Sequence, residues 1–446
     1  MKIAVIGGGT AGHMAAAHIS KHFPQFELYH IYDSKIPSIG VGEGTLPGFP
    51  VWLTEITGLD YPDLKELCQI TIKYGNCFEN WGNKHQQFMH HFYPIGDTYA
   101  YHISADQIVK ILQDYISATH IDKKVIDLKS DGITVDIAFE DNTSLQADLA
   151  IDARGFPKSL NDNHLKLSLI PTNAALIRQC PGYDKRLVNV KMGEQLFQYE
   201  SATRAVARPH GWIFVIPLTH RTSYGYIYNS SINSAEEIAT DFDEFLSLEG
   251  VEFTGKQKKL NFPNFTQQTL FDGAIFKLGN AASFLEPLEA TAIAVTLQQM
   301  YSFSHWPLGY LSQQKQRGKL KESNVQVLNR YLLKNIYKLS LFVGWHYAMG
   351  SAFDTEFWRF AKSNFQQGIQ KLEDQEIIAE FDDYLQTGFD FDDPINQHEI
   401  FVNKTTQFQA IDDETNLAES NIKTFSQFPP QSFAEVGYGM GYFPEI

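Results

Sequence analysis

Apolar runs and helical spacing alternate at the start of the chain. Residues 2–6 form a short apolar run, residues 13–22 have helical spacing with small residues on one side, and residues 27–32 form a second apolar run. Continuous apolar runs of this length are typical of strands that are buried on both faces of a parallel sheet. The order of strand, helix and strand therefore predicts a βαβ unit at the N-terminus.

The middle of the chain alternates mainly as strands, and its last third is mainly helical. Helical spacing predicts helices over residues 101–117 and 235–248. Strands are expected over residues 124–128, 132–139, 148–152, 212–216, 223–228 and 276–279, with a turn at Asp141-Asn142. Helical spacing continues from Ile293 to about Leu385. The tail, residues 390–446, is richer in Pro, Asp and Gln and has no clear pattern.

Composition narrows the class of protein. The chain has 446 residues, of which 43% are hydrophobic and 20% charged, as in a globular protein. Acidic residues outnumber basic ones by 52 to 36, and a net charge of −16 repels nucleic acid. The many aromatic residues fit either core packing or an aromatic-lined pocket, and composition alone favours packing.

The number of cysteines and the lengths of the apolar runs indicate in which cellular compartment the protein is expected. The three cysteines, Cys68, Cys77 and Cys180, are odd in number and widely spaced, which argues against a disulfide framework. No apolar run reaches the roughly 18 residues that a membrane helix needs, and no signal-peptide pattern precedes the first strand. We therefore expect a soluble, cytoplasmic protein that binds neither nucleic acid nor membrane.

The turn after the first predicted strand carries a dinucleotide-binding motif. Gly7, Gly9 and Gly12 have the GxGxxG spacing, with Thr10 and Ala11 between the last two glycines. These glycines permit a tight turn and the close approach of a pyrophosphate to a helix N-terminus. Asp33, 21 positions past Gly12, and Ser34 follow the next strand, where an acid can bind a ribose hydroxyl. This motif alone does not distinguish FAD from NAD.

Two later segments favour FAD. Residues 148–155 (DLAIDARG) and 278–282 (LGNAA) resemble strand–turn elements of flavoprotein monooxygenases, in which the later element lies against the flavin. That class usually has Gly-Asp at the later position, whereas this chain has Gly279-Asn280. The asparagine keeps a hydrogen-bonding amide but lacks the charge, so we expect an altered contact at the same place.

Further segments resemble the flavin-dependent halogenases. Residues 39–47 (IGVGEGTLP), with Val41 and Gly42, resemble the GVGEAT-x-P loop; residues 73–81 resemble the segment that begins with the catalytic lysine, eight positions before Trp81. Residues 286–293 (EPLEATAI) resemble EPLESTGI. Residues 342–347, 354–358 and 439–441 also match family elements, so the resemblance covers nearly the whole chain.

The segment around Trp212 is a further segment that resembles the flavin-dependent halogenases. Trp212, Phe214, Ile216 and Pro217 resemble the WxWxIP motif, with phenylalanine for the second tryptophan. In the family this motif is thought to keep the flavin from acting as an ordinary monooxygenase, but core packing explains the same residues equally well. Ordinary flavin hydroxylases lack this combination with the lysine and the EPLESTGI segment.

The resemblance implies an architecture. We expect an α/β fold with an FAD-binding module of the flavin monooxygenase type, an interleaved β and helical substrate module, and a largely helical C-terminal part. Residues 1–446 would form a single compact unit. The FAD module would comprise roughly residues 1–50, 100–160 and 268–300, and the substrate module roughly residues 51–99, 161–267 and 301–446.

The resemblance also implies a reaction and a role for individual residues in it. In the family, reduced FAD and O₂ oxidise a halide ion to hypohalous acid. By resemblance, the backbone N–H groups of Thr291 and Ala292 hold the halide, Ile293 borders the flavin, Lys73 directs the hypohalous acid, and Glu289 acts as base and cation stabiliser. Alanine at 292 replaces a family glycine and adds a methyl group beside the halide. Since the chain has one dinucleotide motif, FADH₂ would come from a separate NAD(P)H-dependent flavin reductase.

Each assignment has a plainer alternative. A lysine is usually a solvated surface charge, and Glu289 could be a carboxylate favoured by the positive end of a helix. His85, His90 and His91 lack the spacing of metal ligands, and a polar loop is the more economical interpretation. The expected function is halogenation of an electron-rich, indole-like or phenolic substrate. The alternatives are a hydroxylating flavin monooxygenase and a flavin-binding protein without activity.

Overall fold

A computed structural model describes residues 1–36, 43–181, 190–192, 195–197, 202–313, 318–389 and 427–443, with backbone alone given for 190–192 and 195–197. Its first sheet is parallel and has the strand order β22-β12-β1-β2-β8. These strands are β1 (Lys2–Ile6), β2 (Glu27–Tyr32), β8 (Thr119–Asp122), β12 (Leu149–Asp152) and β22 (Ile275–Lys277). Helix α1 (Thr10–His22) follows β1 directly. The predicted βαβ unit is confirmed, although its helix begins three residues before His13.

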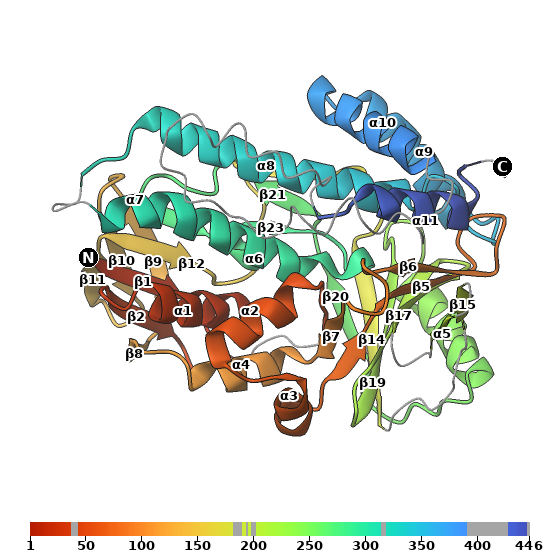
Figure 1. Ribbon diagram of the computed structural model, residues 1–446, viewed down its shortest axis with the longest axis horizontal. Coiled ribbons are helices and arrows are strands. Elements are labelled where there is room, and N and C mark those ends of the chain that lie inside the picture. Colours follow the sequence, from red (N-terminus) through yellow and green to blue (C-terminus); the bar gives the residue numbers. More distant parts are fainter. Residues whose placement is uncertain are drawn as a thin grey trace.

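A larger sheet forms the other half of the molecule (Figure 1). Its order is β20-β14-β19-β18-β17-β5-β6, and its strands are antiparallel except for the β17–β5 pair. The strands are β5 (Gly75–Glu79), β6 (Gln87–His91), β14 (Ala174–Pro181), β17 (Ala202–Arg208), β18 (Gly211–Pro217), β19 (Arg221–Tyr228) and β20 (Lys258–Asn261). Helix α5 (Ala235–Leu248), which matches the predicted range, packs Phe242 and Phe245 onto one face of this sheet.

A three-stranded sheet connects these two parts, and it corrects one expectation. Helical spacing predicted a helix over residues 101–117, but β7 (Ala100–Ile103) is a strand and only α4 (Ala105–Gln113) is helical. Strand β7 pairs with β4 (Thr71–Lys73) on one side and with β3 (Glu43–Gly44) on the other. Partners distant in the sequence thus override the local helical pattern.

The remaining strands form small sheets. Strands β9 (Val125–Ser130), β10 (Val135–Phe139) and β11 (Ser144–Ala147) make a meander, with the expected turn at Asp141-Asn142. Strands β13 (His164–Lys166), β21 (Phe265–Gln267) and β23 (Ser283–Phe284) form a three-stranded antiparallel sheet, and β15 (Val190–Met192) pairs with β16 (Gln195–Phe197).

Helices cover the sheets. They are α2 (Gly48–Thr57), α3 (Tyr61–Cys68), α6 (Thr291–Phe303), α7 (Gly309–Ser312), α8 (Glu322–Trp345), α9 (Glu356–Gln370), α10 (Gln375–Phe389) and α11 (Pro430–Met440), with short turns of other helix types at Gly279–Ala281, Leu288–Ala290 and Ser304–Leu308. The predicted α/β class with a helical C-terminal part is confirmed. None of the helices within the described ranges is long and apolar enough to cross a membrane.

Helix α8 spans two hydrophobic cores. Its first turns place Val325 and Leu328 in the core that packs on the parallel sheet. Its last turns place Leu339 and Phe342 in the core beside the larger sheet. Figure 1 shows α8 running along the top of the molecule, above α6 and toward α11. Helix α8 therefore bridges the two parts of the fold, and its C-terminal end lies over the larger sheet.

Candidate active site

The glycine-rich turn has the geometry of a pyrophosphate-binding loop. A Cβ atom on Gly7 would lie 2.2 Å from the Ala153 carbonyl oxygen, and one on Gly12 would lie 2.0 Å from the Gly7 carbonyl oxygen. Only glycine fits at these two close approaches. A Cβ on Gly9 would meet nothing within 4 Å, and α1 begins at Thr10 without a side-chain cap. An open helix N-terminus of this kind suits a phosphate group.

Other residues assigned to the flavin surround this loop. A Cβ on Gly279 would lie 2.7 Å from the Ala11 Cβ, so the late glycine turn packs against the loop. Asp33 follows β2 and accepts a hydrogen bond from the Lys35 N–H, whereas Ser34 donates from its N–H and its hydroxyl to Asp122. Val41 and Gly42 lie outside the described residues.

The predicted halide site lies at the start of α6. The preceding residues, Glu289 and Ala290, have φ angles of 65° and 56°, and no side chain caps the helix. The hydroxyl of Thr291 is buried and has no hydrogen-bond partner among the described residues. Free N–H groups and an unsatisfied hydroxyl at a helix N-terminus are suited to an anion.

A pocket joins this helix start to the late glycine turn. Its lining includes Gly279 and Asn280, assigned to the flavin, together with Thr291 and Ala292, assigned to the halide. Ile293 follows in the first turn of α6 and is buried in the core that packs on the parallel sheet. The fold therefore brings residues that were assigned to the flavin and residues that were assigned to the halide to the same pocket.

Lys73 is a buried lysine. Its side chain is 0% exposed, and its Nζ donates to the Thr45 carbonyl oxygen at 3.3 Å and lies 5.3 Å from the centre of the Phe92 ring. A Cβ atom on Gly44 would lie 3.3 Å from both Lys73 Nζ and Ala290 Cβ, so the amine lies close to the turn formed by Glu289 and Ala290. Burial lowers the pKa of Lys73 to about 7, and the charge of Glu289 offsets only part of this effect.

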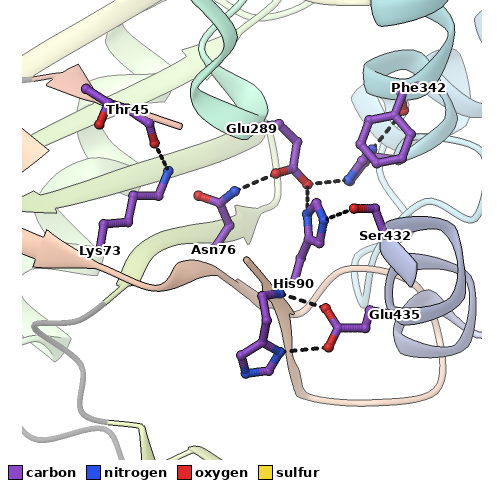
Figure 2. A network of polar contacts seen from close by, with 10 residues as sticks. Thr45, Lys73, Asn76, His90, Glu289, Phe342, Ser432 and Glu435 are labelled. Carbon is purple, nitrogen blue, oxygen red and sulfur yellow. Dashed lines mark hydrogen bonds and ion pairs between the residues drawn. The ribbon is translucent and has the colours of Figure 1, made fainter. Parts of the chain in front are cut away.

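Glu289 is the centre of a buried polar network (Figure 2). Its Oε1 accepts hydrogen bonds from His90 Nδ1 at 2.8 Å and from His346 Nε2 at 2.9 Å, and its Oε2 accepts one from Asn76 Nδ2. His90 Nε2 lies 2.8 Å from the Ser432 hydroxyl on α11. Burial alone would raise the pKa of Glu289, but the charge of His90 and the donors from both histidines hold it well below its usual range.

The prediction of a polar loop is correct for His85, which is exposed and precedes β6, but it is wrong for His90 and His91. These two residues lie on β6, are almost fully buried, and each pairs with a glutamate. His91 donates from its N–H and its ring to Glu435, which fixes α11 on β6. Although burial lowers the pKa of His90, the Glu289 carboxylate raises it above the ordinary histidine value overall.

Four residues of this network were not identified from the sequence. They are Asn76, His90, His346 and Ser432, all of which are buried. The available signal was an apolar strand pattern around two histidines at residues 88–91, since histidines on a buried strand need polar partners. Among the described residues, no three His, Cys, Asp or Glu side chains are arranged to hold a metal ion.

The segment around Trp212 lies in the core beside the site. Trp212 is 1% exposed, and its indole N–H donates to the Tyr347 hydroxyl at 2.9 Å. The Phe214 ring occupies the space over Gly225, where a Cβ would lie 2.1 Å from it. Ile216 is buried, and the Pro217 carbonyl accepts from the Thr71 hydroxyl at 2.7 Å. These contacts are core packing next to the site, and the shielding role stays a prediction.

Comparison with known proteins identifies the family. The family model for tryptophan halogenases matches residues 2–98 and 96–445. The chain therefore belongs to the tryptophan halogenase family, and it is a flavin-dependent halogenase that acts on an aromatic compound.

Individual relatives are distant in sequence. The tryptophan 6-halogenase of Streptomyces toxytricini is 22% identical over 440 residues, covering 81% of each chain. The tryptophan 7-halogenase of Lentzea aerocolonigenes is 22% identical over 447 residues, covering 83% of this chain and 80% of its own length. The structure of a flavin-dependent halogenase from Xanthomonas campestris is similar with a TM-score of 0.74 at 20% identity, over 100% of this chain and 89% of that one.

Proposed function

We propose that this protein halogenates an electron-rich aromatic substrate, indole-like or phenolic, with FADH₂, O₂ and a halide ion. The observation that carries the proposal is the buried Lys73 amine beside the turn that presents Glu289 and the open start of α6. The names of the relatives support an indole ring, because they act on tryptophan.

The residues of the glycine turns would hold the flavin. The loop around Gly9 would receive the pyrophosphate, Asp33 and Ser34 the ribose end, and Gly279, Asn280 and Ile293 the ring end, with Val41 and Gly42 as further contacts. Bound reduced FAD supplies, with O₂, the oxidising power that converts halide to hypohalous acid. A separate NAD(P)H-dependent reductase would deliver FADH₂. Under this proposal, the discontinuous FAD module expected from the sequence is the unit that binds it.

The protein's own groups would then direct the oxidised halogen. The N–H groups of Thr291 and Ala292 hold the halide without offering a side chain that the oxidant could attack. The Lys73 amine binds the hypohalous acid or accepts its halogen. Attack on the arene leaves a positive charge on the ring, which the Glu289 carboxylate stabilises before it removes the ring proton. Burial of both groups strengthens these electrostatic effects.

The test uses the purified protein with a flavin reductase, NADH, FAD and chloride, bromide or iodide in separate reactions. A panel of indoles and phenols is offered, and products are read by mass spectrometry. We expect a product with one halogen in place of hydrogen, and none from Lys73→Ala, which should still reoxidise flavin. A product that gains oxygen would instead establish hydroxylation. Equal halogenation by Lys73→Ala would overturn the lysine assignment.

A further inference from the structure

Two consecutive residues just after α8 contact two glutamates in the segment of residues 286–290. This segment leads into the proposed halide site at the start of α6 and is called the halide turn below. His346 Nε2 donates to Glu289 Oε1, and the Tyr347 hydroxyl donates to Glu286 Oε1. Both glutamates are almost fully buried: Glu289 is 2% exposed and Glu286 is 0% exposed. One helix end therefore contacts both ends of the segment from Glu286 to Glu289.

This segment has a backbone that needs support. Glu289 and Ala290 both have positive φ angles, which are unfavourable for residues other than glycine. Such a conformation persists only when surrounding contacts impose it. The backbone bond from Ala290 N–H to the Pro287 carbonyl is local to the turn. Long-range contacts come from the two glutamate side chains and from the Glu286 N–H, which donates to Asn264.

The Tyr347 hydroxyl belongs to an ordered chain of donors. Trp212 donates to Tyr347, and Tyr347 donates to Glu286, whose second oxygen accepts from the Thr172 hydroxyl. The Glu286 N–H donates in turn to Asn264 Oδ1 at 2.8 Å. Donor chains of this kind polarise each other and fix one arrangement. The segment around Trp212 is thereby joined to the halide turn.

The two ring nitrogens of His346 both face acceptors. Its Nδ1 lies 2.9 Å from the Phe342 carbonyl oxygen, which can only accept, so this nitrogen carries a proton. Its Nε2 lies 2.9 Å from Glu289, which also accepts from His90 and Asn76. Glu289 therefore faces three side chains, Asn76, His90 and His346, and the His346 ring links its carboxylate to the Phe342 carbonyl near the end of α8.

We propose that His346 and Tyr347 are positioning residues that hold the halide turn. They keep the first N–H groups of α6 and the Glu289 carboxylate in fixed places relative to Lys73, without touching the substrate. This inference rests on the proposed function, because it assigns a purpose to the same turn. It adds that the geometry of the turn depends on α8.

The first test is Tyr347→Phe, which keeps the ring and removes one hydroxyl. Loss of a hydrogen bond to a buried acid typically changes an equilibrium constant about tenfold or more. Because Tyr347 holds the turn that presents the halide site, we expect the halide KM to rise roughly tenfold. FAD affinity should not change, and a larger share of reoxidised flavin should end as hydrogen peroxide. The matched control is Tyr226→Phe, since Tyr226 is a buried phenol that donates to Asp241 on the opposite face of the larger sheet. Equal halide KM values in Tyr347→Phe and the unchanged protein would overturn the proposal.

The second test needs no flavin or turnover. Hydrogen–deuterium exchange, followed by mass spectrometry, should be faster at the backbone N–H groups of residues 286–292 in His346→Leu than in the unchanged protein. Equal exchange in the two proteins would overturn the positioning role of His346. If the unchanged protein fails to halogenate any substrate while the exchange differs, the proposed function fails and the positioning of the turn stands.

A conservative variant separates positioning from loss of the side chain. Glutamine at 346 retains one donor for Glu289, whereas leucine retains none. His346→Gln should keep most of the halide affinity and arene halogenation of the unchanged protein, while His346→Leu should raise the halide KM and lose arene halogenation. If both variants keep the halide KM and the halogenation rate of the unchanged protein, His346 does not position the turn.

Discussion

Asn76 donates a hydrogen bond to Oε2 of Glu289, and in Figure 2 its amide lies between that carboxylate and the Lys73 side chain. Lys73 ends β4 and Asn76 lies on β5, so a short stretch of chain supplies both the amine and a donor to the carboxylate. The other carboxylate oxygen takes the two histidine donors. Asn76 therefore completes the set of donors that keeps Glu289 ionised.

Removing this donor should weaken halogenation. In Asn76→Leu, Oε2 of Glu289 is buried without a partner, which costs about 1.5–3 kcal/mol for a charged acceptor. We expect kcat/KM for the arene to fall about 10-fold to 100-fold, as steady-state kinetics would measure. Asn335→Leu is the control, because Asn335 donates to a carbonyl within α8. An arene kcat/KM unaltered by Asn76→Leu would mean that Glu289 does not need this donor.

The pH dependence of halogenation should report the state of Lys73. Burial lowers the pKa of Lys73 to about 7, so the amine is mostly protonated below that pH and neutral above it. A neutral amine can accept a halogen, whereas an ammonium can only donate a hydrogen bond. We expect the product rate at saturating substrate to rise as pH increases from about 6 to about 8. A rate that falls over this range would show that the ammonium is the active form.

The glycine loop can be tested apart from the chemistry. The structure leaves space for a side chain at position 9, so Gly9→Val should fold, while its side chain occupies the place expected for the pyrophosphate. FAD affinity, followed by flavin fluorescence, should be lost. Gly48→Val is the control, because a Cβ at Gly48 also meets nothing within 4 Å. Unchanged affinity in Gly9→Val would remove the loop from the flavin site.

Glu286 should make stability depend on pH. Burial raises the pKa of Glu286 to about 7 from an ordinary value of 4.5. Since the folded-state pKa is the higher one, its contribution to stability is full below about pH 4.5 and is lost as pH rises through 7. The difference amounts to about 3 kcal/mol. In urea unfolding, Glu286→Gln should gain stability relative to the unchanged protein between pH 5 and pH 8. A constant difference across that range would contradict the raised pKa.

The parts of the fold with local patterns could be predicted from the sequence. The βαβ unit follows from apolar runs and glycine spacing, and α5 follows from its helical spacing. The structure adds that the Ser234 side chain caps α5. The strand at Ala100–Ile103 could not, because its identity depends on pairing with Thr71–Lys73 and not on its own residues.

The candidate site also contains residues that a local sequence pattern predicts and residues that only contacts between distant segments bring together. Lys73, Glu289 and the start of α6 belong to recognisable segments, and the structure brings them together. The donors to Glu289 come from distant segments: His90 lies 199 positions from it, and Ser432 lies 342 positions from His90. No local pattern reports contacts between such separated residues. The local pattern therefore predicts a polar loop at His90, which the structure places on a buried strand.

Replacing the carboxylate itself should separate halide oxidation from arene halogenation. Glu289→Gln is nearly isosteric, and the Asn76 amide can turn its oxygen toward the new amide group, so the fold should survive. Glutamine cannot accept the ring proton or balance the cationic ring, and loss of such an interaction typically lowers the rate about 10²-fold or more. Hypohalous acid should still form, because the proposed halide site consists of backbone N–H groups and does not need the Glu289 carboxylate.

A thioether added as a trap would detect this oxidant while the halogenated arene falls. The matched control is Glu435→Gln, which removes another buried carboxylate that is paired with a histidine, His91, on the same strand as His90. That variant should keep most of its arene product, whereas Glu289→Gln should not. If trap signal and arene product vanish together in Glu289→Gln, Glu289 shapes the halide site, and a different group must remove the ring proton.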